Sequence, residues 1–252
     1  MPHVPIDGST SVVFVLSRAQ AEARTQGENG SLGMTGWTVA SLNDFGRTRL
    51  SQHFYMRDFL FSDIAAVHGL VNAPDDPELA VAAGTQLCEQ LLEPLQRLFG
   101  RVAIRSAYRS CAVNQLGNER GHNCASNAKN YAAHIWDRRD AAGHMGAMAC
   151  IVLAEFVDAF PGDGDWTRLA WWIHDHLPYA TLEFFPTNWA VNIGWHEQPA
   201  RSIYSYAKWQ ADAGWKRNGY LTRPGMANHA TGHRTEWEAL AERFPLATGG
   251  QN

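Results

Sequence analysis

The sequence predicts a fold of the α+β class, because it contains both amphipathic helices and short alternating strands. Apolar side chains recur every three or four residues over residues 78–99, which indicates a helix that packs on a core. Apolar and polar side chains alternate over residues 179–185 and again over residues 189–195. The Pro-Thr-Asn tripeptide between these two strands indicates a hairpin-like connection.

The helices before the hairpin can be placed by their caps and their breaking residues. An apolar stripe predicts a first helix over residues 54–70. Asp76 is a good N-cap for the next helix, and Pro77 suits its first position. Pro94 should kink this second helix, because proline lacks an N–H and its ring disrupts the preceding turn. Gly100 should stop it.

The remaining elements follow the same rules. A short apolar strand is expected at residues 102–105, and residues 141–160 indicate a buried strand that leads into a helix. Asp165 can cap a later helix that Pro178 ends. The two histidines near the end of that helix are two residues apart and point in different directions. We therefore expect them to interact with the C-terminal helix dipole rather than to bind a metal.

The composition indicates an ordinary globular protein and argues against two kinds of partner. The chain has 252 residues, of which 45% are hydrophobic and 18% are charged, and its formal net charge is -4. It has no basic run, so no nucleic-acid partner is expected. Its longest apolar runs are far shorter than the roughly 20 residues that cross a membrane. The N-terminus shows no signal peptide, which predicts a cytoplasmic protein with free cysteine thiols.

Residues 104–140 combine a strand end, an arginine, and a histidine followed by two aspartates. Arg109 is expected to project from the strand end, where its guanidinium can bind a carboxylate with two parallel hydrogen bonds. His134, Asp137 and Asp140 lie at spacings of three and six, so their side chains can converge on one ion. Imidazole nitrogen and carboxylate oxygen are typical ligands of zinc and its first-row neighbours.

Residues 106–110 read Ser-Ala-Tyr-Arg-Ser, with Asn114 soon after and His134 with an aspartate further on. This order resembles the S-G-Y-R-S...N...S-x-H-x-x-G-x-A-x-D signature of the zinc D-alanyl-D-alanine carboxypeptidase family. Vancomycin-resistance dipeptidases and phage endolysin peptidases belong to the same family. The resemblance extends from about Phe54 to about Tyr206. It implies a small, mostly antiparallel sheet with helices packed on one side.

The resemblance also implies a zinc site. His134 stands for the family's first histidine. Asp140, six residues later where the family's aspartate lies seven residues later, stands for that aspartate, and Asp137 is the alternative carboxylate. Asn192 stands where the family has its second zinc histidine. Because alternate residues of a strand share one face, His196 points to the same side as Asn192. His196 would supply the missing nitrogen in a shifted or bulged strand, and Asn192 is the other residue that could complete the ligand set.

The activity that the resemblance implies is metal-assisted hydrolysis of an amide bond. The substrate would be a small peptide, or a peptidoglycan-type peptide, with a free C-terminal carboxylate. The metal would lower the pKa of a bound water, and Glu183 or Glu197 would take its proton. Apolar neighbours are expected to raise the pKa of Glu183, which suits a general base. Arg109 would hold the substrate's carboxylate or polarise its carbonyl. The residues expected to bind the substrate are Tyr108, Arg109, Asn114 and Asn192.

Two other functions fit the same residues. One is a non-catalytic module that binds cell-wall peptides, and the other is a repurposed metalloenzyme of the same fold that acts on an amino-acid-like molecule. Residues 51–210 are expected to form the zinc-peptidase-like domain. Residues 1–50 would form an extension that packs on this domain or acts as a lid or substrate-binding loop. Residues 211–252 would form a covering segment.

Overall fold

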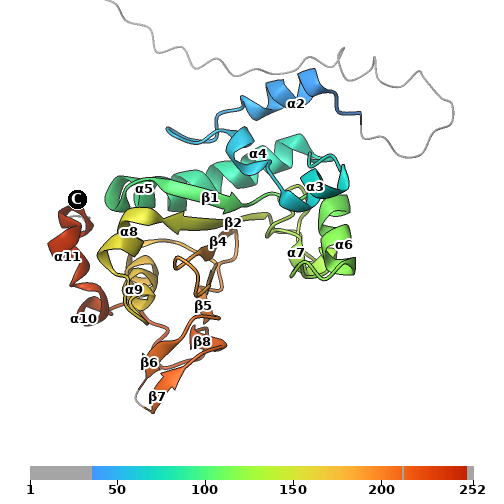
Figure 1. Cartoon of the computed structure of the whole chain (residues 1–252). Helices are drawn as coiled ribbons and strands as arrows, with labels where there is room; N and C mark the ends of the chain where they lie inside the picture. Colours follow the sequence, from blue (N-terminus) through green and yellow to red (C-terminus); the bar gives the residue numbers. More distant parts are fainter. Residues whose placement is uncertain (1–35, 212, 249–252) are drawn as a thin grey trace, which may run out of the picture. The chain divides into compact units, whose positions relative to one another are not determined.

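A six-stranded sheet with helices on one face organises the chain (Figure 1). The computed structural model describes residues 36–211 and 213–248, so the expected N-terminal extension lies outside it as far as residue 35. The strand order is β1-β2-β4-β3-β5-β8, and every neighbouring pair is antiparallel except β3 and β5. The predicted α+β class, with a small and mostly antiparallel sheet, is therefore confirmed.

The bounds of the elements are as follows. The strands of the sheet are β1 (Val102–Ser106), β2 (Gly146–Leu153), β3 (Thr181–Phe184), β4 (Val191–His196), β5 (Ser202–Ser205) and β8 (Gly219–Thr222). A separate antiparallel pair consists of β6 (Trp209–Ala211) and β7 (Gly214–Lys216). The α-helices are α2 (Val39–Gly46), α3 (Asp63–His68), α4 (Pro77–Leu87), α5 (Glu93–Phe99), α6 (Cys111–Glu119), α7 (Asn127–Asn130), α8 (Ala154–Ala159), α9 (Trp166–His176), α10 (Arg234–Trp237) and α11 (Leu240–Arg243). Two 3-10 helices, η1 (Met56–Phe59) and η3 (Pro245–Thr248), and the π-helical turn η2 (Cys88–Leu92) complete the list. Among the described residues, no helix is both long and apolar enough to cross a membrane.

The long helix predicted for residues 78–99 is present, with a π-helical turn in its middle. Asp76 caps α4 with a 3.0 Å hydrogen bond, and Pro77 occupies the first turn, as predicted. The helix continues from α4 through η2 into α5 and stops at Gly100, whose φ is 79°. The wide π turn ends at Leu92, two residues before Pro94, where the sequence predicts a kink. It accommodates the proline, which cannot donate a backbone hydrogen bond.

The single helix predicted for residues 54–70 is wrong, because two short helices, η1 and α3, replace it. Ser62 lies between them with an extended backbone, and its side chain accepts a 3.3 Å hydrogen bond from the Ala65 N–H. This capping bond starts a new helix and fixes where α3 begins. Helix α3 ends at Gly69, which adopts the left-handed conformation with a φ of 65°.

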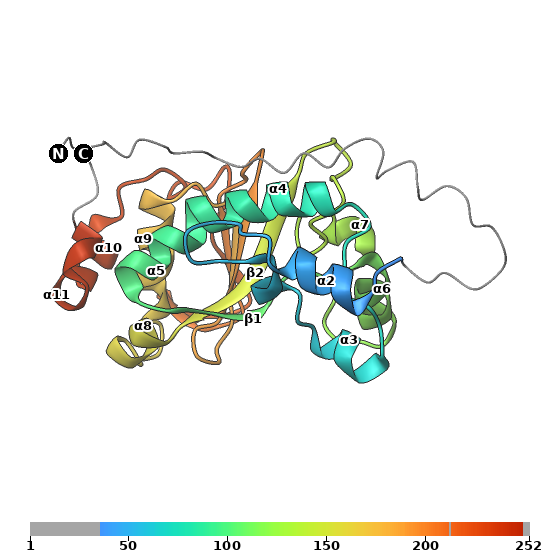
Figure 2. The ribbon, with the colours of Figure 1, turned by 90° about the horizontal axis from the view of Figure 1, so that it is seen from above.

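The two faces of the sheet differ in chemistry. Helices α4, α5 and α9 pack on one face (Figure 2). On this face the ring centroids of Trp166 in α9 and Phe184 in β3 lie 4.6 Å apart. The opposite face carries polar side chains that are partly exposed, so it is the face that can offer a site. The fully buried residues of the helix-covered face include Ile151, Leu182, Phe184, Ile193 and Ile203.

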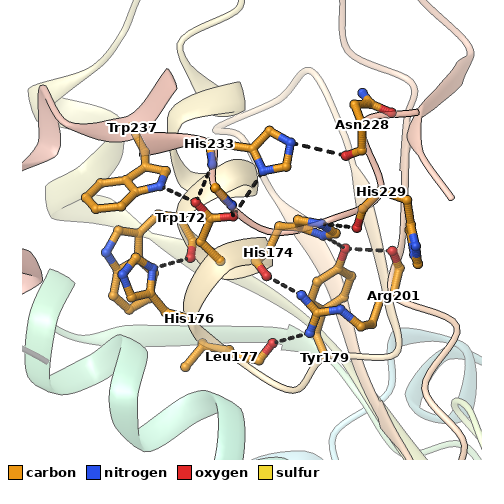
Figure 3. A network of polar contacts seen from close by, with 12 residues as sticks. Trp172, His174, His176, Leu177, Tyr179, Arg201, Asn228, His229, His233 and Trp237 are labelled. Carbon is orange, nitrogen blue, oxygen red and sulfur yellow. Dashed lines mark hydrogen bonds and ion pairs between the residues drawn. The ribbon is translucent and has the colours of Figure 1, made fainter. Parts of the chain in front are cut away.

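Helix α9 differs from the prediction at its start and agrees with it at its end. Asp165 precedes the helix, but its side chain makes no capping hydrogen bond. Of the two histidine rings near the end, that of His176 contacts a carbonyl of the last turn, as predicted, whereas that of His174 contacts groups outside the helix (Figure 3). The Nδ1 atom of His174 lies 2.6 Å from the Tyr179 hydroxyl, and that of His176 lies 2.8 Å from the Trp172 carbonyl oxygen.

Asp175 anchors the C-terminal tail to the end of α9. Its carboxylate accepts hydrogen bonds from the backbone N–H groups of Gly232 at 3.0 Å and His233 at 2.7 Å, and from the Trp237 indole at 2.7 Å. The ring of His233, seen in Figure 3, lies 3.0 Å from the same carboxylate and stacks on Trp171. Burial opposes the charge, but the hydrogen bonds from Trp237 and His233 bring the pKa of Asp175 below its usual value.

Replacement of Asp175 by alanine is expected to lower the free energy of unfolding by about 3 kcal/mol, because it leaves several donors without an acceptor. Urea unfolding measures this loss. The matched control is Glu238→Ala in the same tail, since Glu238 is exposed and lies 3.9 Å from Arg234. The control should lower the free energy of unfolding by less than about 0.5 kcal/mol. Equal losses in the two variants would contradict the anchoring role of Asp175.

Candidate functional site

A pocket of about 520 Å³ lies at the end of β1, between α3 and the loop at residues 122–124. Figures 1 and 2 both show α3 and α6 side by side at this end of β1. The chain leaves β1, turns through Ala107 and Tyr108, and brings Arg109 to the pocket wall. The polar groups of the wall include Ser106, Arg109, Cys124, His134, Cys150 and Asn192.

Arg109 carries a positive charge that no carboxylate of the described residues neutralises. Its Nη1 donates to Asn114 Oδ1 at 3.2 Å and to Cys124 Sγ at 2.8 Å. One carboxylate, Asp63, also lines the pocket, but it is exposed, and no ion pair joins it to Arg109 in the described part of the chain. Burial lowers the pKa of Arg109. The pocket therefore penalises this charge, and a bound anion would relieve the penalty.

Asn114 is fully buried and orients Arg109. Besides the bond from Arg109, its Oδ1 accepts a 3.0 Å hydrogen bond from Asn130. Its Nδ2 donates to Asn127 Oδ1 at 2.8 Å and to the Ala125 carbonyl at 3.0 Å. Every hydrogen-bonding position of the amide is used. Asn114 therefore has no group left for a ligand, in contrast to the substrate-binding role that the sequence predicts.

Asn72 fixes the backbone on both sides of Arg109. Its Nδ2 donates to the carbonyl oxygens of Leu60 and Tyr108, both at 2.9 Å, and its Oδ1 accepts from the Ser110 N–H at 2.8 Å. Asn72 is not among the site residues that the sequence predicts. Its partners at Tyr108 and Ser110 are 36 and 38 residues away, so no local signal could reveal this role.

His134 lies on a tight loop, residues 131–135, that is bonded to both Arg109 and β2. The Arg109 N–H donates to the His134 carbonyl at 2.8 Å, and β2 donates a 3.0 Å hydrogen bond to the same loop. Ala132 has a φ of 55°, a left-handed conformation that costs a non-glycine residue roughly 1 kcal/mol. Such strain persists where surrounding contacts force the backbone, and it is common at functional sites.

The ring of His134 is neutral. Its Nδ1 donates to the Ala107 carbonyl at 2.8 Å. Burial, together with the nearby charge of Arg109, lowers the pKa of His134 to about 3. A neutral ring that donates through Nδ1 has its lone pair on Nε2. His134 thus gives the wall of the pocket a hydrogen-bond acceptor and not a second positive charge.

Acid should destabilise the fold through His134. The folded protein keeps this ring neutral down to about pH 3, whereas the unfolded chain takes up a proton below about pH 6.5. The unfolded state binds more protons in that window, so the free energy of unfolding should fall by about 2 kcal/mol between about pH 6.5 and pH 5. Urea unfolding of the wild type and of His134→Gln, with a chelator present, measures the effect. Equal pH slopes in the two proteins would contradict a neutral, buried His134.

One side chain from each strand forms a row across the polar face of the sheet. Three members of this polar row, Ser106, Cys150 and Asn192, line the pocket. Asn192 Nδ2 donates to Glu183 Oε2 at 2.9 Å, so Glu183 orients an amide of the pocket wall. Glu183 therefore has polar neighbours, and not the apolar surroundings that the sequence predicts. In cross-strand order, the polar row consists of Ser106, Cys150, Asn192, Glu183, Tyr204 and Tyr220.

The structure does not bring the four predicted metal ligands together. His134 lines the pocket, but Asp137 is buried and accepts a 2.7 Å hydrogen bond from the Asp75 N–H. Asp140 and His196 line a second pocket, where Asp140 Oδ2 lies 3.3 Å from His196 Nε2. Within residues 36–211 and 213–248, no group of three or more His, Cys, Asp or Glu side chains is arranged to bind a metal ion.

Tyr108 and Glu197 also have structural contacts. Tyr108 borders the pocket, but its side chain is fully buried, and burial with the charge of Asp137 raises its pKa. Glu197 is exposed beyond the end of β4, where it accepts a 2.8 Å hydrogen bond from the Met145 N–H. Tyr108 thus lies at the pocket with its side chain buried, whereas Glu197 is not among the residues that line it.

Two cysteines of the wall are not among the predicted site residues. Cys124 and Cys150 are free thiols, as the sequence predicts, and both lie near the charge of Arg109. Burial raises the pKa of Cys150, so this thiol stays protonated near neutral pH. Only the register of the sheet, which pairs Cys150 with Asn192, reveals its place in the site.

Comparison with known proteins adds no relative. The chain matches no protein-family model, no curated protein and no solved structure. The resemblance to the zinc D-alanyl-D-alanine carboxypeptidases therefore stays a prediction that rests on the motif.

Proposed function

We propose that the pocket binds a small peptide or amino-acid derivative through its free carboxylate. The chain would be a binding module with a fold like that of the zinc carboxypeptidases. The observation that carries this proposal is the charge of Arg109, which is penalised by burial and lacks a carboxylate partner among the described residues. A ligand carboxylate would accept two parallel hydrogen bonds from the guanidinium. Because Asn114 already orients Arg109, little protein would have to be ordered on binding.

Other groups of the pocket suit the rest of such a ligand. The neutral ring of His134 can accept a hydrogen bond from a peptide N–H. Asn192, oriented by Glu183, and Ser106 supply further polar groups beside it. An amino-acid derivative with a carboxylate and an adjacent amide therefore matches the polar chemistry of the wall.

The metal-dependent peptidase ranks second, as does a repurposed metalloenzyme for amino-acid-like molecules. The predicted ligands do not fit one zinc ion, because Asp137 and the Asp140–His196 pair make their contacts apart from His134. One observation favours a reaction at this site: His134 and Arg109 share a pocket, as the family resemblance implies.

Binding and turnover measured on the same samples separate these functions. The full-length chain is titrated calorimetrically with N-acetyl-D-alanyl-D-alanine and with its all-L isomer, once with zinc and once with a chelator, while release of free alanine is followed. A binding module predicts the same Kd in both conditions and no release. Zinc-dependent release would support the peptidase, and bound zinc without release would support the metalloenzyme. No binding of either peptide in either condition would contradict the proposal.

A further inference from the structure

Apolar side chains form one wall of the pocket that contains Arg109. Phe61 is 63% exposed and Val67 is 79% exposed, and both line the pocket together with Ile64. Single exposed apolar residues are common on protein surfaces. Here, however, two of them lie beside a half-buried charge in one cavity. This apolar wall, Phe61, Ile64 and Val67, is therefore a candidate for ligand contact.

The position of the apolar wall is fixed by close packing. Gly117 on α6 allows α3 to approach, because a Cβ at this position would come within 2.8 Å of Ile64 Cδ1 and 2.6 Å of Cys124 Sγ. The same Cys124 accepts the hydrogen bond from Arg109. Asn72 links the two parts a second time. Its side chain forms hydrogen bonds with the Leu60 carbonyl, just before the wall, and with the backbone on both sides of Arg109. The wall and the guanidinium are thus held at a fixed separation.

The pocket has a further apolar side chain outside α3, the ring of Phe185. Phe185 lines the same cavity and stacks on Tyr206, with 5.2 Å between ring centroids and 9° between ring planes. The stack holds the Phe185 ring in a set orientation. A ligand bound at Arg109 would therefore have apolar surface available from the wall on α3 and from Phe185.

We propose that the apolar wall recognises an aliphatic or aromatic side chain on the ligand residue whose carboxylate binds Arg109. This inference rests on the proposed function. Charge complementarity selects the occupant: the guanidinium requires an anion, and apolar surface beside it favours an anion with an apolar group attached. The preferred ligand class is an acylated amino acid, or a peptide C-terminus, with a leucine-sized or larger apolar side chain.

Calorimetric titration with N-acetylglycine and with both enantiomers of N-acetylleucine tests the inference on the full-length chain. The better leucine enantiomer should bind about tenfold more tightly than the glycine compound, because part of its side chain leaves water. Replacing both Phe61 and Val67 by serine should remove this preference, so that the leucine and glycine compounds bind with equal affinity. The matched control is Val39→Ser, since Val39 is 90% exposed and does not line the pocket. It should keep the tenfold preference.

The outcomes distinguish this inference from the proposed function. If none of the acids binds, the proposed function fails. If glycine and leucine compounds bind equally to the wild type, the apolar wall has no role, while carboxylate binding stands. A double variant that keeps the leucine preference, or that loses both ligands equally, would also overturn the role of the wall.

Discussion

Replacement of Arg109 by glutamine is expected to weaken the binding of N-acetylleucine by roughly 100-fold. Hydrogen bonds to charged groups are worth about 1.5–3 kcal/mol each, and the variant loses both the charge and the paired donors. The guanidinium lines the pocket and keeps its positive charge at all ordinary pH values, so it can neutralise a carboxylate. Calorimetric titration of wild type and variant measures the loss.

Two further variants show whether the effect belongs to the geometry of Arg109. Arg109→Lys keeps the charge but not the planar fork, so about a tenfold loss is expected. Arg105→Gln is the matched control, because Arg105 is an exposed arginine of β1 outside the pocket wall. The affinity of the Arg105→Gln variant for N-acetylleucine should stay within about twofold of that of the wild type. A loss as large as that of Arg109→Gln would indicate general electrostatic attraction rather than a defined contact.

Gly146→Ala is expected to lower the free energy of unfolding by about 3 kcal/mol. A Cβ at this position would collide with the Ala132 carbonyl oxygen and come within 2.9 Å of the Trp195 carbonyl oxygen. The His196 ring, at 2.8 Å, could turn away from the new Cβ, but the two carbonyl oxygens are backbone atoms, and no side-chain rotation relieves those collisions. The displaced loop carries His134 and accepts the hydrogen bond from the Arg109 N–H, so ligand affinity should fall as well.

Gly194→Ala is the matched control for this prediction. Gly194 lies on β4, and the nearest atom to a new Cβ would be Met148 Cε at 3.1 Å, the end of a flexible side chain. Methionine can move aside, so a loss below about 1 kcal/mol is expected. Urea unfolding measures both variants. A Gly146→Ala protein as stable as Gly194→Ala would contradict the close contact between the loop at residues 131–135 and β2.

The parts of the fold that local chemistry decides could be predicted from the sequence. Asp76 with Pro77 starts a helix and Gly100 ends it, because each residue acts on the backbone beside it. The hairpin of β3 and β4 follows from alternation and a short turn. The break at Ser62 could not be predicted in the same way. The apolar stripe continues across it, and a single capping hydrogen bond starts the new helix.

The convergence of the predicted metal ligands could not be judged from spacing. Asp140 Oδ1 accepts hydrogen bonds from the Ala142 and His144 N–H groups, so a local turn directs its carboxylate toward His196. His134, six residues earlier, is directed elsewhere by the loop bonded to Arg109. The polar row likewise depends on the register between strands that are distant in sequence, which no local pattern encodes.

Arg109 could be identified from the sequence because its position after a strand end is a local feature. What makes it a candidate binding residue is not local: the absence of a carboxylate partner in the described part of the chain, and the buried amides that orient it. Asn114 and Asn72 hold Arg109 in place only because the fold brings them beside it. Their importance depends on where the chain folds back on itself.

The most direct test of the account is a comparison of N-acetylleucine with N-acetylleucinamide on the wild-type chain. The two ligands share the acyl group and the apolar side chain and differ in the carboxylate that Arg109 is proposed to bind. Calorimetry should give an affinity for the acid at least about 30-fold above that for the amide. Equal affinities, or binding of the amide alone, would contradict recognition of a carboxylate by Arg109.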